Sequence, residues 1–145
     1  MRKVKNKHIG AYGILISRGK IALINKACGG YRGKLDLPGG GIEHTETPEK
    51  ALCRELMEEA GVCVTKYQLL DAVATNITWQ MTKNTIEDLH HIGILYVVKA
   101  KGQLKKTPDG IDSNGAKWYK ISELNKEDIT PFATYGLEKL GFKLK

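Results

Sequence analysis

The stretch from Thr47 to Gly61 carries clear signals for the start and the end of a helix, and it limits the possible folds more than any other part of the chain. Thr47 is a favourable N-cap, and Pro48 suits the first helical position because its missing N–H has no partner there. Gly61 can adopt the left-handed conformation that ends many helices. The sequence therefore predicts an amphipathic helix over residues 48–60, whose apolar side chains recur at helical spacing: Leu52, Cys53, Leu56, Met57 and Ala60.

Three glutamates crowd one side of this predicted helix. Glu55 is followed by Glu58 at i+3 and by Glu59 at i+4, and like charges at those spacings each cost a helix roughly 0.2–0.5 kcal/mol. Arg54, one turn before Glu58, supplies part of a counter-charge. A hard divalent cation such as Mg²⁺ binds carboxylate oxygens and would supply the rest. A solvated acidic face is the simpler alternative, and the acids alone leave both open.

The pattern around these acids resembles the signature of the Nudix hydrolase family. Gly40 is followed by five residues and Glu46, and then by seven residues and the run RELMEEAGV, which ends at Val62. Every defined position of that signature is filled. The resemblance implies an α/β protein with the Nudix fold, in which a mixed β-sheet lies in an α/β/α sandwich. It also implies an enzyme that hydrolyses a phosphoanhydride in a nucleoside diphosphate linked to another group X.

The resemblance assigns metal binding to the acids of the helix. Glu58 and Glu59 are expected to be metal ligands together with the carbonyl of Gly39, and the expected cation is Mg²⁺, with Mn²⁺ as a substitute. Glu55 is expected to be a further ligand or the general base, and the sequence leaves these two roles open. A bound cation neutralises phosphate oxygens and makes a bound water more acidic, which is what attack on a phosphoanhydride needs.

Other residues of the signature are expected to position this machinery. Arg54 would orient the glutamates through charge-assisted hydrogen bonds and so takes part in the catalytic set. Glu46 would secure the loop before the helix. The glycine run Gly39–Gly41 lets the backbone approach a ligand closely, so Gly40 is a candidate substrate contact.

Candidate phosphate-binding cations and a candidate additional base lie outside the signature. Lys26 and Arg32 flank a glycine-rich loop and would reach a substrate phosphate, although solvated loop cations explain them equally well. Many Nudix hydrolases add an acid from a late loop, but the usual glutamate is absent ahead of Trp118. Asp112 is our candidate for that catalytic role. Asp109 is the reserve, Glu87 and Asp88 are further acids that would be able to approach the site, and an ordinary surface position remains an alternative for each of them.

The substrate is weakly indicated. The residues at 77–79 match neither the ADP-ribose nor the dinucleoside polyphosphate branch, so we favour a nucleoside triphosphate cut to monophosphate and pyrophosphate, as in MutT-like proteins. Tyr12, Tyr31 or Trp79 would be able to stack on a base, though each also suits a core position. The alternatives are hydrolysis of ADP-ribose, a nucleotide sugar, a dinucleoside polyphosphate or an RNA 5′ end, or a nucleotide sensor without catalysis.

The flanks of the signature predict a mostly β chain with one more helix. The last helix is expected from Pro131 to Leu140, packed through Tyr135, Leu137 and Leu140. The predicted strands cover residues 9–17, 21–24, 62–64, 67–75 with a continuation to 81, 91–100 and 117–120. Adjacent residues of a strand face opposite sides, so His90 and His91 are not expected to bind one ion together.

The composition is typical of a soluble globular protein. Its 145 residues are 41% hydrophobic and 27% charged, and we expect one domain over residues 1–145 in the cytoplasm. No apolar run has the length of a membrane span or of a signal peptide. Three cysteines without CxxC spacing are expected to stay reduced: Cys28, Cys53 and Cys63.

The net charge of +7 would help to attract a small substrate that carries phosphates, although a solubilising surface explains it equally well. No basic run is interleaved with aromatic residues, so nucleic acid is not an expected partner. Homodimers are frequent in the family that the signature resembles, which leaves a homodimer open.

Overall fold

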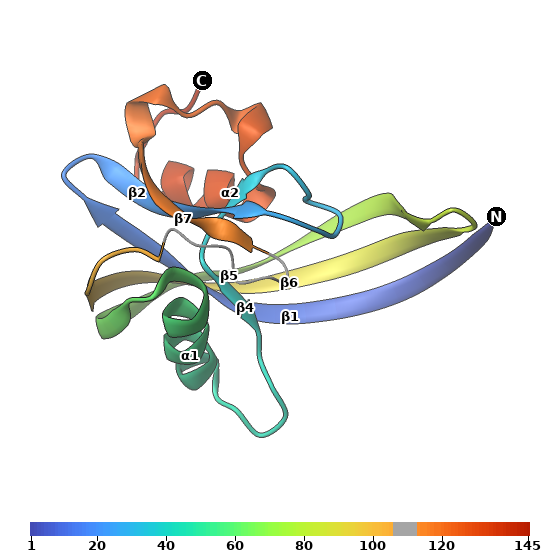
Figure 1. Cartoon of the computed structure of the whole chain (residues 1–145), viewed down its shortest axis with the longest axis horizontal. Helices are drawn as coiled ribbons and strands as arrows, with labels where there is room; N and C mark the ends of the chain where they lie inside the picture. The colour runs from blue at the N-terminus through green and yellow to red at the C-terminus, as the bar shows by residue number, and fades with distance from the viewer. Residues whose placement is uncertain (106–112) are drawn as a thin grey trace.

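A computed structural model describes residues 1–105 and 113–145 of the chain, so the candidate acids Asp109 and Asp112 lie outside the described residues. The described residues form one sheet in the order β3-β2-β1-β6-β5, with β4 paired to β1 and β7 paired to β2 (Figure 1). Strand β1 runs parallel to β6, whereas β5 and β6 form an antiparallel hairpin. The sheet is therefore mixed, as predicted. Its strands are β1 (Arg2–Ser17), β2 (Lys20–Lys26), β3 (Leu35–Asp36), β4 (Gly39–Gly41), β5 (Cys63–Thr82), β6 (Thr85–Lys101) and β7 (Ser113–Lys120).

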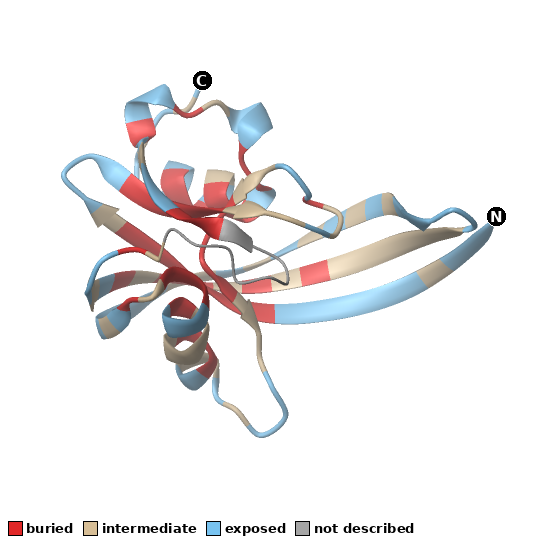
Figure 2. Cartoon of the chain, viewed as in Figure 1, coloured by how far each residue is buried: buried red, intermediate tan, exposed pale blue. Residues whose placement is uncertain are grey.

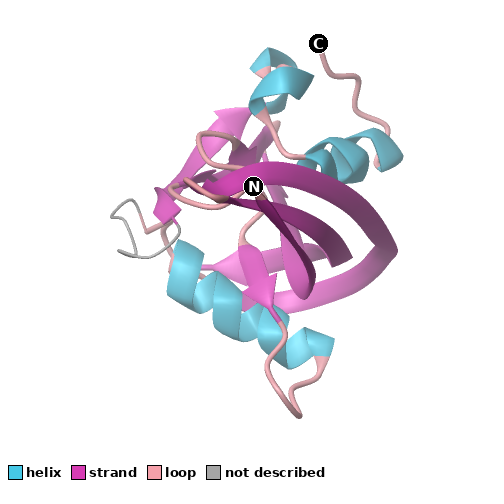
Figure 3. Ribbon diagram, turned by 90° about the vertical axis from the view of Figure 1, so that its right-hand side faces the viewer, coloured by secondary structure: helices cyan, strands magenta, loops and turns pink. Residues whose placement is uncertain are grey.

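Two helices cover opposite faces of this sheet, α1 (Pro48–Ala60) and α2 (Pro131–Lys139) (Figures 1 and 3). Side chains of β1 alternate between the two sides. Ala11 packs in the hydrophobic cluster that includes Leu52 of α1, and Tyr12 packs in the cluster that includes Leu137 of α2. The predicted α/β/α sandwich is confirmed. Two 3₁₀ turns, Ile121–Glu123 and Lys126–Asp128, lead into α2.

The predicted ends of α1 are confirmed. The Thr47 side chain accepts a hydrogen bond from the Lys50 N–H, and Gly61 has the left-handed φ of 73°. The apolar face is narrower than predicted, because Met57 is 49% exposed. Glu59 is buried in its place among the packed residues of the helix.

The packing face of α2 differs from the sequence prediction. Leu137 is fully buried as expected, but Tyr135 and Leu140 are 40% and 37% exposed. The buried face repeats at i, i+1, i+4 and i+5 and includes small residues that bring the helix close to the sheet. Its members are Phe132, Ala133, Gly136 and Leu137.

The strands are longer than the apolar runs predicted. Residues 2–9 of β1 pair with residues 85–92 of β6, and β5 is one strand with three register irregularities between Cys63 and Thr82. These strands project from the sandwich as a three-stranded extension, which we call the blade: residues 2–9, 75–82 and 85–91 (Figure 1). Polar and charged side chains of β1 there are exposed (Figure 2), so hydrophobic patterning could not reveal this part of the strand.

No helix among the described residues is long and apolar enough to span a membrane.

Candidate functional site

The guanidinium group of Arg54 lies at the centre of the acidic cluster on α1. Its Nε and Nη2 atoms donate to the two carboxylate oxygens of Glu46 at 2.8 and 2.9 Å. Its Nη1 atom donates to Glu55 at 2.9 Å and to Glu58 at 3.3 Å. Nη2 also donates to the carbonyl of Gly41 at 3.0 Å. One side chain thus ties the glycine strand β4 and three acids together, as expected for a planar, multidentate donor.

The contact with Arg54 shapes the electrostatics of the loop before α1. Hydrogen bonds from Arg54 and from the backbone N–H of Glu43 lower the pKa of the Glu46 carboxyl to about 2. The same ion pair raises the pKa of Arg54 above its already high usual value. Glu46 is therefore ionised throughout the neutral range and fully engaged with Arg54, which agrees with a role in securing the loop.

Glu59 connects α1 to β4. Its side chain is only 3% exposed, and its Oε1 atom accepts a hydrogen bond from the backbone N–H of Gly39 at 2.9 Å. Gly39 has a φ of +146°, and a Cβ there would lie 2.2 Å from the carbonyl oxygen of Ala11. Only glycine fits between β1 and the acidic helix at this point.

Gly40 leaves room for the carboxylate of Glu55. A Cβ on Gly40 would lie 2.7 Å from both Cδ and Oε2 of Glu55, so any other residue at this position would displace the carboxylate. The structure therefore brings together the predicted residues of β4 and α1. It shows the N–H of Gly39 in contact with Glu59, whereas participation of the Gly39 carbonyl stays a prediction.

The donor set of this cluster fits a hard divalent cation, because carboxylate and carbonyl oxygens are the ligands that Mg²⁺ and Mn²⁺ accept. In the described part of the chain, no three Asp, Glu, His or Cys side chains already converge as a formed metal centre. Arg54 donates hydrogen bonds to Glu55 and Glu58, and the backbone N–H of Gly39 donates one to Glu59. A cation would share the oxygens of these glutamates with the present donors, Arg54 and the Gly39 N–H.

A pocket of about 220 Å³ lies on the α2 side of the sheet, where the blade meets the sandwich. Tyr12 lies between this pocket and the acidic cluster. Burial, followed by the charges of Asp36 and Glu59, raises the pKa of its phenol. Tyr12 is the β1 partner of Gly39, so pocket and cluster share a wall. The pocket is lined by His8, Tyr12, Lys26, Cys28, Gly29, Gly30, Tyr31, Asp36, Trp79, Glu87, Leu89 and His91.

Aromatic rings surround the innermost part of this pocket. The Tyr12 hydroxyl and His91 Nε2 are 2.7 Å apart, and His91 Nδ1 lies 3.4 Å from the Tyr31 hydroxyl. Burial, with smaller contributions from His8 and Lys26, lowers the pKa of His91 to about 4. The pKa of Tyr31 is raised to about 12, mainly by burial. At neutral pH these three groups are therefore uncharged hydrogen-bonding partners.

The blade contributes an ordered carboxylate to the same pocket. Glu87 Oε1 accepts a hydrogen bond from the indole N–H of Trp79 at 2.7 Å. Its Oε2 atom accepts one from Nδ2 of Asn6 at 2.6 Å. Gly30 brings the β2–β3 loop onto this surface, since a Cβ there would lie 3.1 Å from the Trp79 ring. Three strands and one loop thus fix the position of Glu87.

The structure separates the two predicted phosphate-binding cations. Lys26 lines the pocket, whereas Arg32 is exposed and outside its lining. Of the two further acids, Glu87 lines the pocket, but Asp88 contacts Asn76 at 3.1 Å and Lys3 at 3.9 Å instead.

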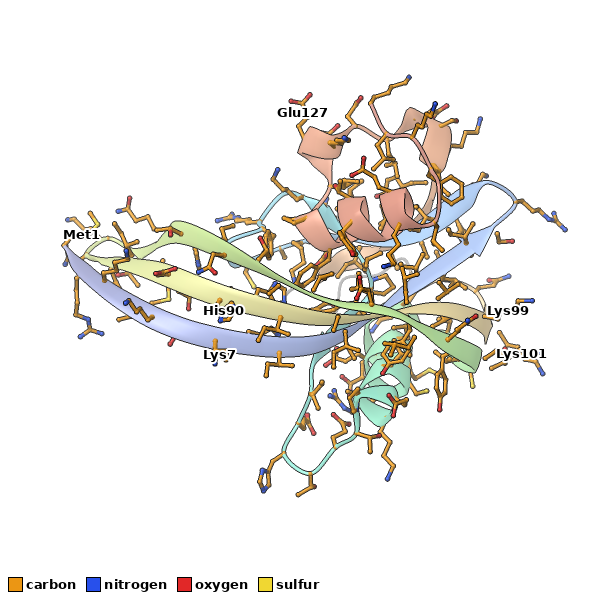
Figure 4. The ribbon with its side chains drawn as sticks, turned by 180° about the vertical axis from the view of Figure 1, so that it is seen from behind. Met1, Lys7, His90, Lys99, Lys101 and Glu127 are labelled. Atoms are coloured by element: carbon orange, nitrogen blue, oxygen red, sulfur yellow. The ribbon has the colours of Figure 1, made fainter. Side chains whose placement is uncertain are left out.

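Alternation along β6 also separates the two histidines. His91 lies in the pocket, while His90 is paired beside Lys7 on the blade and is not among the lining residues (Figure 4).

Sequence reasoning missed several lining residues, among them Asp36 and His8. Asp36 is 3% exposed and its Oδ1 accepts hydrogen bonds from Thr130 Oγ1 at 2.6 Å and from the Leu37 N–H at 2.8 Å. Those contacts join β3 to the start of α2, a relation between distant segments that no local pattern predicts. The period of two along β6 would have grouped Glu87, Leu89 and His91 on one face.

Comparisons with known proteins agree with this geometry. The family model for the NUDIX domain matches residues 6–140. An 8-oxo-dGTP diphosphatase of Proteus vulgaris is 40% identical over 75 residues, which cover 51% of this chain and 67% of that protein. An 8-oxo-dGTP diphosphatase of Escherichia coli K12 is 30% identical over 98 residues, or 68% of this chain and 67% of that protein.

A solved structure extends the likeness to the fold. The crystal structure of a MutT NUDIX hydrolase from Burkholderia pseudomallei superposes with a TM-score of 0.74 at 24% sequence identity. The match covers 92% of this chain and 98% of that one.

Proposed function

Because the chain belongs to the NUDIX domain family and is a Nudix hydrolase acting on nucleoside diphosphate compounds, we propose that it cuts a (deoxy)nucleoside triphosphate to the monophosphate and pyrophosphate with the help of Mg²⁺. The observation that carries this proposal is the shared wall between the acidic cluster and a pocket of about 220 Å³. That volume suits a base, with the phosphates directed towards the cluster.

Nudix hydrolases generally use divalent metal cations, and the acids of α1 supply the donors for one here. Glu58, Glu59 and the carbonyl of Gly39 would hold Mg²⁺ or Mn²⁺, with Glu55 as a further ligand or as the base. When bound, the cation neutralises phosphate oxygens and lowers the pKa of coordinated water.

The protein's own groups then bind and orient the substrate. Arg54 keeps Glu55 and Glu58 at fixed positions through its hydrogen bonds. Lys26 provides positive charge beside the pocket for a phosphate. A water oxygen forms a new P–O bond as the anhydride P–O bond breaks, and the water proton passes to the base, for which Glu55 and Asp112 are the candidates. Arg32 stays a predicted phosphate contact.

A substrate screen tests the proposal. Phosphate and pyrophosphate release would be measured with Mg²⁺ or Mn²⁺ for the four dNTPs, GTP, 8-oxo-dGTP, ADP-ribose, a nucleotide sugar, a dinucleoside polyphosphate and triphosphorylated RNA. Glu59→Gln serves as the blank, and mass spectrometry identifies the products. We expect a triphosphate to give monophosphate and pyrophosphate. Exclusive turnover of another substrate class, or nucleotide binding without turnover, would overturn the proposal.

A further inference from the structure

The carboxylate of Glu87 lines the pocket, and the proposed chemistry does not use it. Glu87 lies on β6. Strand β1 separates β6 from β4, the strand that contacts the acids of α1. Each oxygen of the Glu87 carboxylate already accepts one hydrogen bond, from Trp79 and from Asn6. A carboxylate oxygen can accept two, so each oxygen keeps acceptor capacity.

The surroundings of Glu87 match a flat aromatic ligand. Trp79 and Tyr31 line the pocket, and the volume of about 220 Å³ is below the usual 300–1,000 Å³ of whole-ligand sites. A base fits such a space and can stack on an aromatic side chain. Because Trp79 both lines the pocket and donates to Glu87, the stacking surface and the carboxylate have a fixed mutual position.

Guanine and adenine differ at the edge that such a carboxylate would meet. Guanine presents two adjacent donors, N1–H and the exocyclic N2–H₂, whereas adenine presents the bare N1 acceptor beside one amino group. A carboxylate accepts from the guanine pair through both oxygens. The carboxylate oxygens and adenine N1 are all hydrogen-bond acceptors, so their lone pairs repel and adenine binding is disfavoured.

We propose that Glu87 is a specificity-determining residue that selects nucleotides with a guanine-type donor edge, 8-oxoguanine included, over adenine nucleotides. The inference rests on the proposed function for the position of the base. Asn6 and Trp79 act as positioning residues, because their N–H groups fix the plane of the Glu87 carboxylate without needing to touch the nucleotide edge themselves.

The test is the substitution Glu87→Gln, which keeps the size of the side chain and removes the acceptor pair. Asp88→Asn is the matched control, because it removes a carboxylate from the next residue of β6 that faces Asn76 and Lys3 rather than the pocket. Two readouts are needed: kcat/KM for dGTP and dATP, and the dissociation constants of GMP and AMP without metal.

We expect Glu87→Gln to lower the guanine-to-adenine ratio about tenfold to hundredfold in both readouts, the range of a hydrogen bond to a charged group. Asp88→Asn should leave the ratio unchanged, and Glu87→Asp, which keeps the charge, should retain a guanine preference. An unchanged ratio in a folded Glu87→Gln protein, or an adenine preference in the unsubstituted protein, would overturn the inference.

The binding arm separates this inference from the proposed hydrolysis. If the protein hydrolyses no nucleotide but binds GMP better than AMP, and Glu87→Gln removes that preference, base selection stands and triphosphate hydrolysis falls. If triphosphates are hydrolysed with a ratio that Glu87→Gln does not change, hydrolysis stands and base selection falls.

Discussion

The acidic cluster on α1 and the pocket at the base of the blade are built in opposite ways. Glu46, Arg54 and Glu59 lie within 14 residues of one another, and a loop and one helix place them. The pocket draws on segments from His8 to His91, which lie on five strands and a loop. The cluster is local in sequence, whereas the pocket exists only in the folded chain.

This difference suggests that the two regions have separate roles, with the cluster responsible for the reaction and the pocket for the choice of nucleotide. A compact motif can carry the same phosphate chemistry in many proteins, while a pocket assembled from separate strands can change residue by residue without disturbing that motif. Substitutions in the cluster should therefore alter the rate of reaction, and substitutions in the pocket should alter which nucleotide is bound. Variants in both regions test this comparison.

The largest effect is expected from Glu59→Gln or Glu58→Gln. Loss of one proposed metal ligand should lower kcat by roughly 10³-fold, because cation stabilisation of the phosphates contributes several kcal/mol. The affinity for GMP without metal should stay within about twofold. Steady-state kinetics and titration calorimetry measure the two quantities, with Glu138→Gln on α2 as the control. Full activity in both variants would refute the metal assignment.

Arg54→Lys should have a smaller effect on the same region. A lysine cannot reproduce the paired contacts of the guanidinium with Glu46 while also reaching Glu55. We expect kcat to fall about 10- to 100-fold, as for residues that orient metal ligands, together with a lower Tm. Arg18→Lys in the exposed β1–β2 turn is the matched control. Rescue of full activity by lysine would show that charge alone suffices.

The smallest effect is expected from His91→Gln, and it is measured through the pH dependence of stability. The pKa of His91 is about 4 in the folded protein, against about 6.5 in an unfolded chain, so the unfolded chain binds more protons between these values. The stability of the native protein is therefore complete above pH 6.5 and falls by up to about 3 kcal/mol as the pH approaches 4.

Urea unfolding at several pH values measures this loss. Removal of the imidazole should flatten the dependence between pH 6.5 and 4.5, whereas His44→Gln in the exposed loop should not. Glu46, whose folded pKa is about 2, titrates mainly below this window. Its contribution is present above the usual carboxyl pKa and is lost only as the pH falls towards 2. Equal slopes for the native and His91→Gln proteins would contradict the burial argument.

The sequence predicted the elements whose signals are local. Thr47 and Gly61 predicted the ends of α1, and Pro131 predicted the start of α2. The blade was underestimated because its β1 half is polar, so its strand character comes from pairing with β6 rather than from an apolar pattern. The predicted apolar faces of both helices are broader than the buried faces in the structure, since Met57 and Tyr135 are exposed.

For the candidate site, the sequence alone determined the family and the acids of α1, because a helix fixes the spacing of residues three and four apart. Only the tertiary structure decided that Glu87, Trp79 and Asn6 meet, that Asp36 joins β3 to α2, and that Lys26 rather than Arg32 lines the pocket. Those relations depend on strand order and register, which arise when distant segments pair and pack. The positions of residues within a local motif follow from their spacing in the sequence, but the neighbours of a pocket residue depend on how the whole sheet is assembled.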